Sequence, residues 1–152
     1  MSAEPIESRF RALQAAIEQW PYAALIGMQP LLHDEGLQFR LAYREELIGN
    51  PALPAIHGGV LGGFMELSAQ AQILWEADCQ LAALPRVVDF SIDYLRPGRP
   101  EDVMGDCRVW RQGQRVANIA VAAWQGDPDR IIATARGHFL MPEAEAGAVG
   151  AR

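Results

Sequence analysis

The 152-residue sequence contains no lysine, since all 13 of its basic residues are arginine. Without a side-chain amine, the chain cannot form the Schiff base on which pyridoxal phosphate and lysine-nucleophile chemistry depends. It has only two cysteines, Cys79 and Cys107, and no CxxC motif, so neither a zinc site nor a dithiol redox centre is predicted. The GxSxG, P-loop and GxGxxG motifs are also missing, which leaves serine hydrolases and nucleotide-binding proteins without support.

Positive charge is scarce as well, because 19 acidic residues outnumber the basic ones and give a net charge of -6. This field repels phosphate backbones, so we expect no nucleic-acid partner. No stretch approaches the ~18 uncharged apolar residues of a membrane span, and the first residues lack the basic and apolar regions of a signal peptide. The three histidines stand apart, so no metal site is expected. These absences together predict a cytoplasmic protein without a membrane partner.

Half of the residues are hydrophobic, which is enough to build the core of one domain of this length. Apolar residues at helical spacing precede Pro21 and predict an amphipathic N-terminal helix in residues 1–21. We expect the main domain to extend over residues 22–141. The remaining segment, 142–152, is rich in alanine, glycine and glutamate, and we expect it to be a flexible tail.

Period-two alternation of apolar and polar residues predicts several strands. The first, 37–44, is expected to pair with part of 23–34 through a turn at 34–36, whereas the prolines of 49–55 indicate a loop. Four more strands, expected to form a meander in chain order, are predicted at 88–94, 102–110, 115–124 and 131–140.

A long helix is predicted in the middle of the chain, at 57–77, where apolar residues cover most of the circumference and no proline occurs. Only a strip of Ser68, Gln72 and Glu76 is expected to face water. The simplest way to bury such a helix is to wrap one curved antiparallel sheet around it. The sequence therefore predicts an α+β fold with an extra helix at its N-terminus.

Glu66 interrupts the apolar pattern of this helix, and its neighbours on the helical wheel are Gly59, Gly62 and Gly63, along with Gln70. Each glycine within a helix costs about 1 kcal/mol relative to alanine, so a compensating close approach of another backbone or a ligand is expected. A carboxylate beside such a surface would be partly desolvated and more basic than usual. The alternative is a solvated glutamate on a helix whose glycines serve packing alone.

The helix begins at His57-Gly58-Gly59, where backbone amides have no partner within the helix and the dipole favours negative charge. An oxyanion could be held there by the Gly58 amide. Gly58 lies eight residues before Glu66, a rise of ~12 Å, so we favour a two-fold dimer that brings Glu66 of one subunit to Gly58 of the other. We interpret His57 as a residue that caps or orders the helix start in preference to a catalytic base.

The run HGGVLGGFME at 57–66, with VDFSIDYLRPG at 88–98, resembles the hotdog-fold thioesterases, in particular the PaaI-like acyl-CoA thioesterases. The resemblance covers residues 35–141. It implies the hotdog fold, a homodimer, the pairing of two dimers into a tetramer, and hydrolysis of an acyl-CoA thioester. Coenzyme A would enter as part of the substrate, and no other cofactor is expected.

By this resemblance Glu66 corresponds to the catalytic carboxylate, acting as general base or as nucleophile, and the Gly58 amide polarises the thioester carbonyl. Gln70 corresponds to a polar position that helps to place the attacking water. Asn50 is similar to an Asn or Gln before the HGG motif, although the loop between them is one residue longer here than is usual.

Coenzyme A needs cationic contacts for its phosphates, and strand ends offer several. The candidates for binding it are Arg96, Arg99, Arg111, Arg115 and Gly59. For the acyl pocket the aromatic candidates are Phe64, Trp75, Trp110 and Tyr94, each of which also fits an ordinary core position.

Two other functions remain open. A 3-hydroxyacyl thioester dehydratase on the same fold would pair His57 with Glu66 across the dimer, and it would hydrate a crotonyl thioester. A non-catalytic acyl-CoA-binding protein would keep the scaffold and bind its ligand without releasing a thiol.

Overall fold

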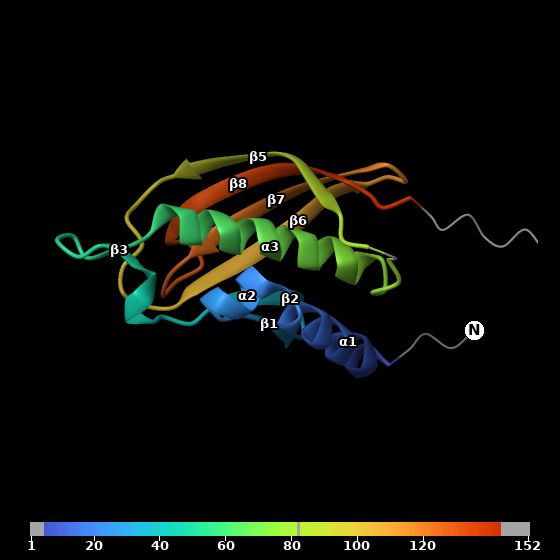
Figure 1. The fold of residues 1–152 in the computed structure, drawn as a ribbon, viewed down its shortest axis with the longest axis horizontal. Helices are drawn as coiled ribbons and strands as arrows, with labels where there is room; N and C mark the ends of the chain where they lie inside the picture. The colour runs from blue at the N-terminus through green and yellow to red at the C-terminus, as the bar shows by residue number, and fades with distance from the viewer. Residues whose placement is uncertain (1–4, 82, 144–152) are drawn as a thin grey trace, which may run out of the picture.

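The computed structural model describes residues 5–81 and 83–143. Its helices are α1 (Ile6–Glu18), α2 (Pro21–Ile26), the 3-10 turn η1 (Glu45–Leu47) and α3 (Gly58–Glu76). Its strands are β1 (Met28–His33), β2 (Gly36–Leu41), β3 (Ile48–Asn50), β4 (Ala55–Ile56), β5 (Arg86–Tyr94), β6 (Val103–Gln112), β7 (Val116–Trp124) and β8 (Ile131–Leu140). Figure 1 shows α3 lying along one face of a curved sheet, with α1 and α2 beside it. This is the predicted α+β architecture.

Within the described residues, the main sheet has six antiparallel strands in the order β1-β2-β6-β7-β8-β5. The hairpin of β1 and β2 turns after His33, where the sequence predicted it. The predicted four-strand meander is wrong for one member, because β5 pairs with β8 and not with β6. Strands β6, β7 and β8 are joined by short turns, whereas residues 95–102 form a longer connection that crosses the end of the sheet. Because β5 pairs with β8 alone, it is an edge strand of the described sheet.

The predicted N-terminal helix is confirmed as α1, and Pro21 then begins a second short helix, as proline commonly does at a first helical position. Leu13 and Ile17 of α1 are almost fully buried in the same hydrophobic core as α3 and the sheet. The division of the chain into helix, domain and tail stays a prediction. Residues 144–152 of the predicted tail lie outside the described residues.

The expectation of an irregular loop at 49–55 is wrong in part, because β3 and β4 form a small hairpin on either side of the turn. The two prolines lie in the turn itself, so the residues that pair between the two strands are not prolines. Ile56 donates its amide to the carbonyl of Gly98, and His57 donates to Leu47. These bonds join the hairpin to two other segments and set the point at which α3 starts.

The prediction that Ser68 and Gln72 face water is wrong, since both side chains are buried and only Glu76 is exposed. The Ser68 hydroxyl donates to the carbonyl of Phe64, and the Gln72 amide donates to the Glu76 carboxylate. The curvature of the sheet encloses this side of the helix, where Gly105 of β6 makes room for the Phe64 ring. No helix in the described part of the chain is both long enough and apolar enough for a bilayer crossing.

Candidate active site at the start of helix α3

The first turn of α3 has four backbone donors, and three of them are occupied. The His57 side chain caps the helix by accepting the Gly59 amide at Nδ1, 2.9 Å away. Val60 and Leu61 donate to the His57 carbonyl. Within residues 5–81 and 83–143, nothing accepts the amide of Gly58. The helix start therefore offers one open N–H group, at the position where negative charge is favoured.

Neighbouring segments are fitted closely around His57 and Gly58. A Cβ atom on Gly49 of the β3–β4 hairpin would lie 2.8 Å from the Cα atom of His57, so only glycine fits there without a shift of the backbone. On the other side, the Tyr94 hydroxyl at the end of β5 donates to the Gly58 carbonyl at 2.7 Å. The sheet and the hairpin together fix the geometry of the turn.

The helix glycines near Glu66 make room for side chains of other elements. A Cβ atom on Gly62 would lie 2.9 Å from Cδ1 of Ile92, and one on Gly63 would collide with the ring of Tyr22 in α2. The expected close approach is therefore found, and among the described residues it is made by side chains instead of a backbone. This contact compensates in part for the low helix propensity of glycine.

Glu66 is half-buried on the same side of α3. Helical side chains lean toward the N-terminus of their helix, and the residues one turn before Glu66 are Gly62 and Gly63. Burial raises the pKa of this carboxyl above its ordinary value of 4.5. No hydrogen bond or ion pair joins Glu66 to another side chain in the described part of the chain. A carboxylate in this position is more basic than usual and has free oxygens.

Gln70 and Asn50 are both engaged in local hydrogen bonds. The Gln70 amide donates to the Pro85 carbonyl at 2.8 Å, which ties the middle of α3 to the residue before β5. The Asn50 side chain accepts the amide of Ala52 and so closes its own turn in the hairpin. Gln70 keeps its side-chain oxygen available, one turn after Glu66.

The arginines proposed for coenzyme A form two groups at opposite ends of α3. Arg96 and Arg99 flank Gly98, whose carbonyl accepts the amide of Ile56 next to the helix start. Arg111 and Arg115 flank the β6–β7 turn, where Gln112 donates to the carbonyl of Ile73 near the helix end. All four side chains are exposed, and none forms an ion pair within the described residues.

The aromatic candidates for an acyl pocket are mostly elsewhere. Phe64 and Trp75 are buried in the core, and Trp110 is exposed on the sheet with Arg108 stacked on its ring. Tyr94 alone of the four contacts the helix start. Tyr22 was not predicted as a neighbour of this site, because nothing in its local sequence pattern relates it to Gly63, 41 positions further along the chain.

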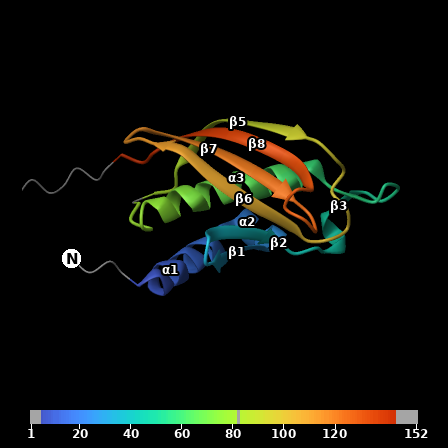
Figure 2. The ribbon, with the colours of Figure 1, turned by 180° about the vertical axis from the view of Figure 1, so that it is seen from behind.

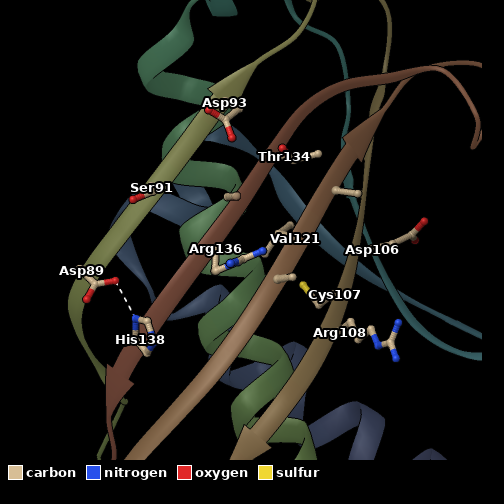
Figure 3. Close-up of a pocket in the computed structure, with 13 residues that line it drawn as sticks. Asp89, Ser91, Asp93, Asp106, Cys107, Arg108, Val121, Thr134, Arg136 and His138 are labelled. Carbon is tan, nitrogen blue, oxygen red and sulfur yellow. Dashed lines mark hydrogen bonds and ion pairs between the residues drawn. The ribbon is translucent and has the colours of Figure 1, made fainter.

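A separate groove lies on the face of the sheet opposite α3, which Figure 2 shows without a covering helix in the described part of the chain. Figure 3 shows its side chains, among them the pair of Asp89 and His138, whose Oδ1 and Nδ1 atoms are 2.8 Å apart. Both members are exposed, so the pair contributes little energy. Burial, and secondarily Asp106, raises the pKa of the Cys107 thiol, which argues against a thiolate nucleophile. No cluster of metal ligands occurs among the described residues.

Known proteins resemble the chain in sequence and in fold. The sequence profile of the thioesterase superfamily matches residues 53–132, which include all of α3 and the strands that follow it as far as the start of β8. The chain is 24% identical over 134 residues to the medium/long-chain acyl-CoA thioesterase YigI of Escherichia coli, with 80% of this chain and 85% of that protein covered.

Two solved structures extend the comparison. A protein from Chromobacterium violaceum is 37% identical, with a TM-score of 0.71 over 92% of this chain and 97% of its own. A protein from Bacillus halodurans, solved with CoA, is 16% identical, with a TM-score of 0.69 over 95% and 97% of the two chains. The fold is therefore the hotdog fold that the sequence predicted, and the family profile spans more than half of the residues. The chain belongs to the thioesterase superfamily.

Proposed function

We propose that the protein is an acyl-CoA thioesterase of the PaaI-like type, which hydrolyses an acyl-CoA to the free acid and coenzyme A. Family membership supports the hydrolysis of a thioester. The name of the curated relative YigI and the CoA bound to the Bacillus halodurans protein support an acyl-CoA substrate. The observation that carries the proposal is the open Gly58 amide at the start of α3, on the helix that also holds the desolvated carboxylate of Glu66.

In this mechanism the thioester carbonyl accepts a hydrogen bond from the Gly58 amide. As the carbonyl carbon becomes tetrahedral, its oxygen gains negative charge, which a preorganised N–H group at a helix start stabilises. His57 keeps the neighbouring Gly59 amide occupied, so the substrate meets one defined donor.

Glu66 then acts in one of two ways. As a general base it removes a proton from water, which attacks the carbonyl carbon and expels the coenzyme A thiolate. As a nucleophile it attacks the carbonyl carbon itself, expels the coenzyme A thiolate and forms a mixed anhydride, which water hydrolyses to the free acid and the Glu66 carboxylate in a second step. Both routes need the ionised carboxylate, and the Gln70 side-chain oxygen one turn later is suited to hold the water.

A homodimer would complete this site. In a single chain Gly58 and Glu66 are separated by eight helical residues, or ~12 Å of axial rise. The edge strand β5 has one side without a neighbouring strand in the described residues, and Val88 on it is 63% exposed. Strand edges of this kind pair readily with a second chain. Two-fold pairing at β5 would bring the helices of two subunits together, and two such dimers could associate through the open face of the sheet.

The test is a panel of acyl-CoA thioesters in which released coenzyme A is measured with a thiol reagent. We expect thiol release from saturated acyl-CoAs, with turnover that depends on Glu66. Hydration of crotonyl-CoA without thiol release would replace the proposal with the dehydratase. Saturable binding without either reaction would show that the protein only binds its ligand.

A further inference from the structure

We propose that Tyr94 is a positioning residue for the reaction, which holds the backbone of Gly58 in the conformation that directs its amide at the thioester carbonyl. The inference rests on the proposed function, because it assigns a task to a residue that the mechanism above does not use.

The contact itself is direct. The Tyr94 hydroxyl donates to the Gly58 carbonyl at 2.7 Å, and the ring lies 3.5 Å from the place of a Cβ atom on Gly58. The same hydroxyl lies 3.4 Å from the corresponding place on Gly62, one helical turn later. Tyr94 therefore covers the side of α3 on which the first two turns carry no side chain.

Glycine at position 58 needs an external restraint on its backbone more than another residue type would at the same place. Glycine has the widest range of backbone angles, and the first residue of a helix is held by few intrahelical bonds. A rotation of the Gly58 backbone would turn its open amide away from the substrate. The Tyr94 hydroxyl binds the Gly58 carbonyl, which belongs to the next peptide unit, and so it limits rotation about the backbone bonds of Gly58 from outside the helix.

Tyr94 is in turn well anchored, although its side chain is 53% exposed. It pairs with Ala133 as the last residue of β5. The amides of Leu95 and Arg96 then both donate to the carbonyl of Ile132, at 2.8 and 3.1 Å. The end of β5 is thus fixed to β8, and the hydroxyl transmits the position of the sheet to the start of α3.

The experiment compares Tyr94→Phe with Tyr43→Phe. Phenylalanine keeps the ring of Tyr94 and removes only the hydrogen bond. Tyr43 is a matched control, since the residue is exposed and its hydroxyl makes no hydrogen bond within the described residues. We expect Tyr94→Phe to lower kcat for acyl-CoA hydrolysis about five- to tenfold, the equivalent of one hydrogen bond, while KM and Tm stay close to wild type. Tyr43→Phe should leave all three unchanged.

A double-mutant cycle tests whether the effect passes through Gly58. A Cβ atom at position 58 would lie 3.5 Å from the Tyr94 ring, an ordinary van der Waals contact, so alanine fits there. The Gly58→Ala substitution also restricts the φ and ψ angles of residue 58 without help from Tyr94. Tyr94→Phe should then lower kcat less in the Gly58→Ala protein than in the wild type. Equal losses in both backgrounds would contradict the inference.

A measurement that needs no turnover separates this inference from the proposed function. In ¹⁵N-labelled protein, the order parameter of the Gly58 amide should fall in Tyr94→Phe and stay unchanged in Tyr43→Phe. An unchanged order parameter in Tyr94→Phe would overturn the positioning role, even in a fully active enzyme. A wild-type protein that releases no thiol would refute the thioesterase proposal, and with it the catalytic purpose of Tyr94.

Discussion

The aromatic ring of Tyr22 in α2 occupies the space that a side chain at Gly63 of α3 would need. Alanine at position 63 should favour the helix by about 1 kcal/mol relative to glycine, but it must first displace the ring. We therefore expect Gly63→Ala to bring no gain in the free energy of unfolding in the wild-type protein, and to stabilise a Tyr22→Ala protein by about that amount. Chemical denaturation of the four proteins of this cycle measures the coupling. Equal effects in both backgrounds would mean that the ring moves aside without cost.

Replacement of the half-buried carboxylate gives the most direct test of the chemistry. Glu66→Gln keeps the shape of the side chain and removes its charge, so the protein should fold normally and lose about 10²- to 10⁴-fold in kcat. Glu76→Gln on the same helix is the matched control, because Glu76 is exposed, and it should retain activity. Thiol release gives the rates, and near-normal turnover of Glu66→Gln would remove this residue from the mechanism.

The pH dependence of activity follows from the desolvation of Glu66. Burial raises the pKa of this carboxyl, and both catalytic routes require its ionised form. As the pH falls, kcat/KM should therefore decline with a midpoint above the ordinary glutamate value of 4.5. A rate profile between pH 4 and pH 8 measures this midpoint, and a decline centred at or below 4.5 would contradict the assignment.

The same shift predicts a pH-dependent cost in stability. Because the folded state holds the Glu66 proton more tightly than the unfolded state, stability is lost as the pH rises from 4.5 through the raised pKa of the folded protein. Glu66→Gln lacks this loss. Its Tm should match the wild type near pH 4 and exceed it at pH 7, by about 2–4 °C for each kcal/mol regained. Because the Glu66 side chain is partly exposed to water, we expect the rise in Tm at pH 7 to be small.

The exposed arginines can be distinguished by a change of substrate. Loss of a charge-assisted contact to a phosphate should raise KM about tenfold or more for acyl-CoA, and leave it unchanged for an acyl-pantetheine, which has no phosphate groups. The Arg96→Ala/Arg99→Ala protein should show this pattern. The Arg111→Ala/Arg115→Ala protein tests the far end of α3, and the same pattern there would indicate a site shared between two chains.

Gln125 fixes the segment that carries Arg99, and it should matter for stability. Its fully buried side chain accepts the Arg99 amide and donates to the carbonyls of Arg99 and Glu101. Gln125→Ala removes these bonds, and we expect a loss of about 2–4 kcal/mol, or a Tm lower by about 5–10 °C. Exposed Gln114→Ala is the control in thermal unfolding. A Tm within 1–2 °C of wild type, on the order of 0.5 kcal/mol, would show that water replaces the lost bonds.

Much of the architecture can be predicted from local patterns. The long apolar helix, the hairpin at 34–36 and the later strands each follow from spacing within one segment. The position of β5 could not be predicted in this way, because it depends on how residues 95–102 cross the end of the sheet. Ser68 and Gln72 have polar side chains at positions that the curved sheet happens to enclose.

In the candidate site, too, some residues can be predicted from local sequence patterns and others cannot. Glu66 and the HGG turn stand out because an acid and several glycines are unusual in a buried helix. Tyr22, Tyr94 and Gln125 give no comparable signal, since each acts on residues that are 24 to 41 positions away in the chain. Only the folded arrangement brings them to their partners.

Since His57 and the helix itself occupy the other donors of the first turn, a carbonyl that binds there meets a single N–H group. One hydrogen bond fixes a point in space and leaves the bound molecule free to swivel about it. This hydrogen bond, the anchor of the carbonyl, does not distinguish between the acyl groups that the carbonyl can carry. Discrimination between short, long and aromatic acids must then arise from the surfaces that surround the anchor, and those surfaces can diverge between relatives while the anchor stays the same.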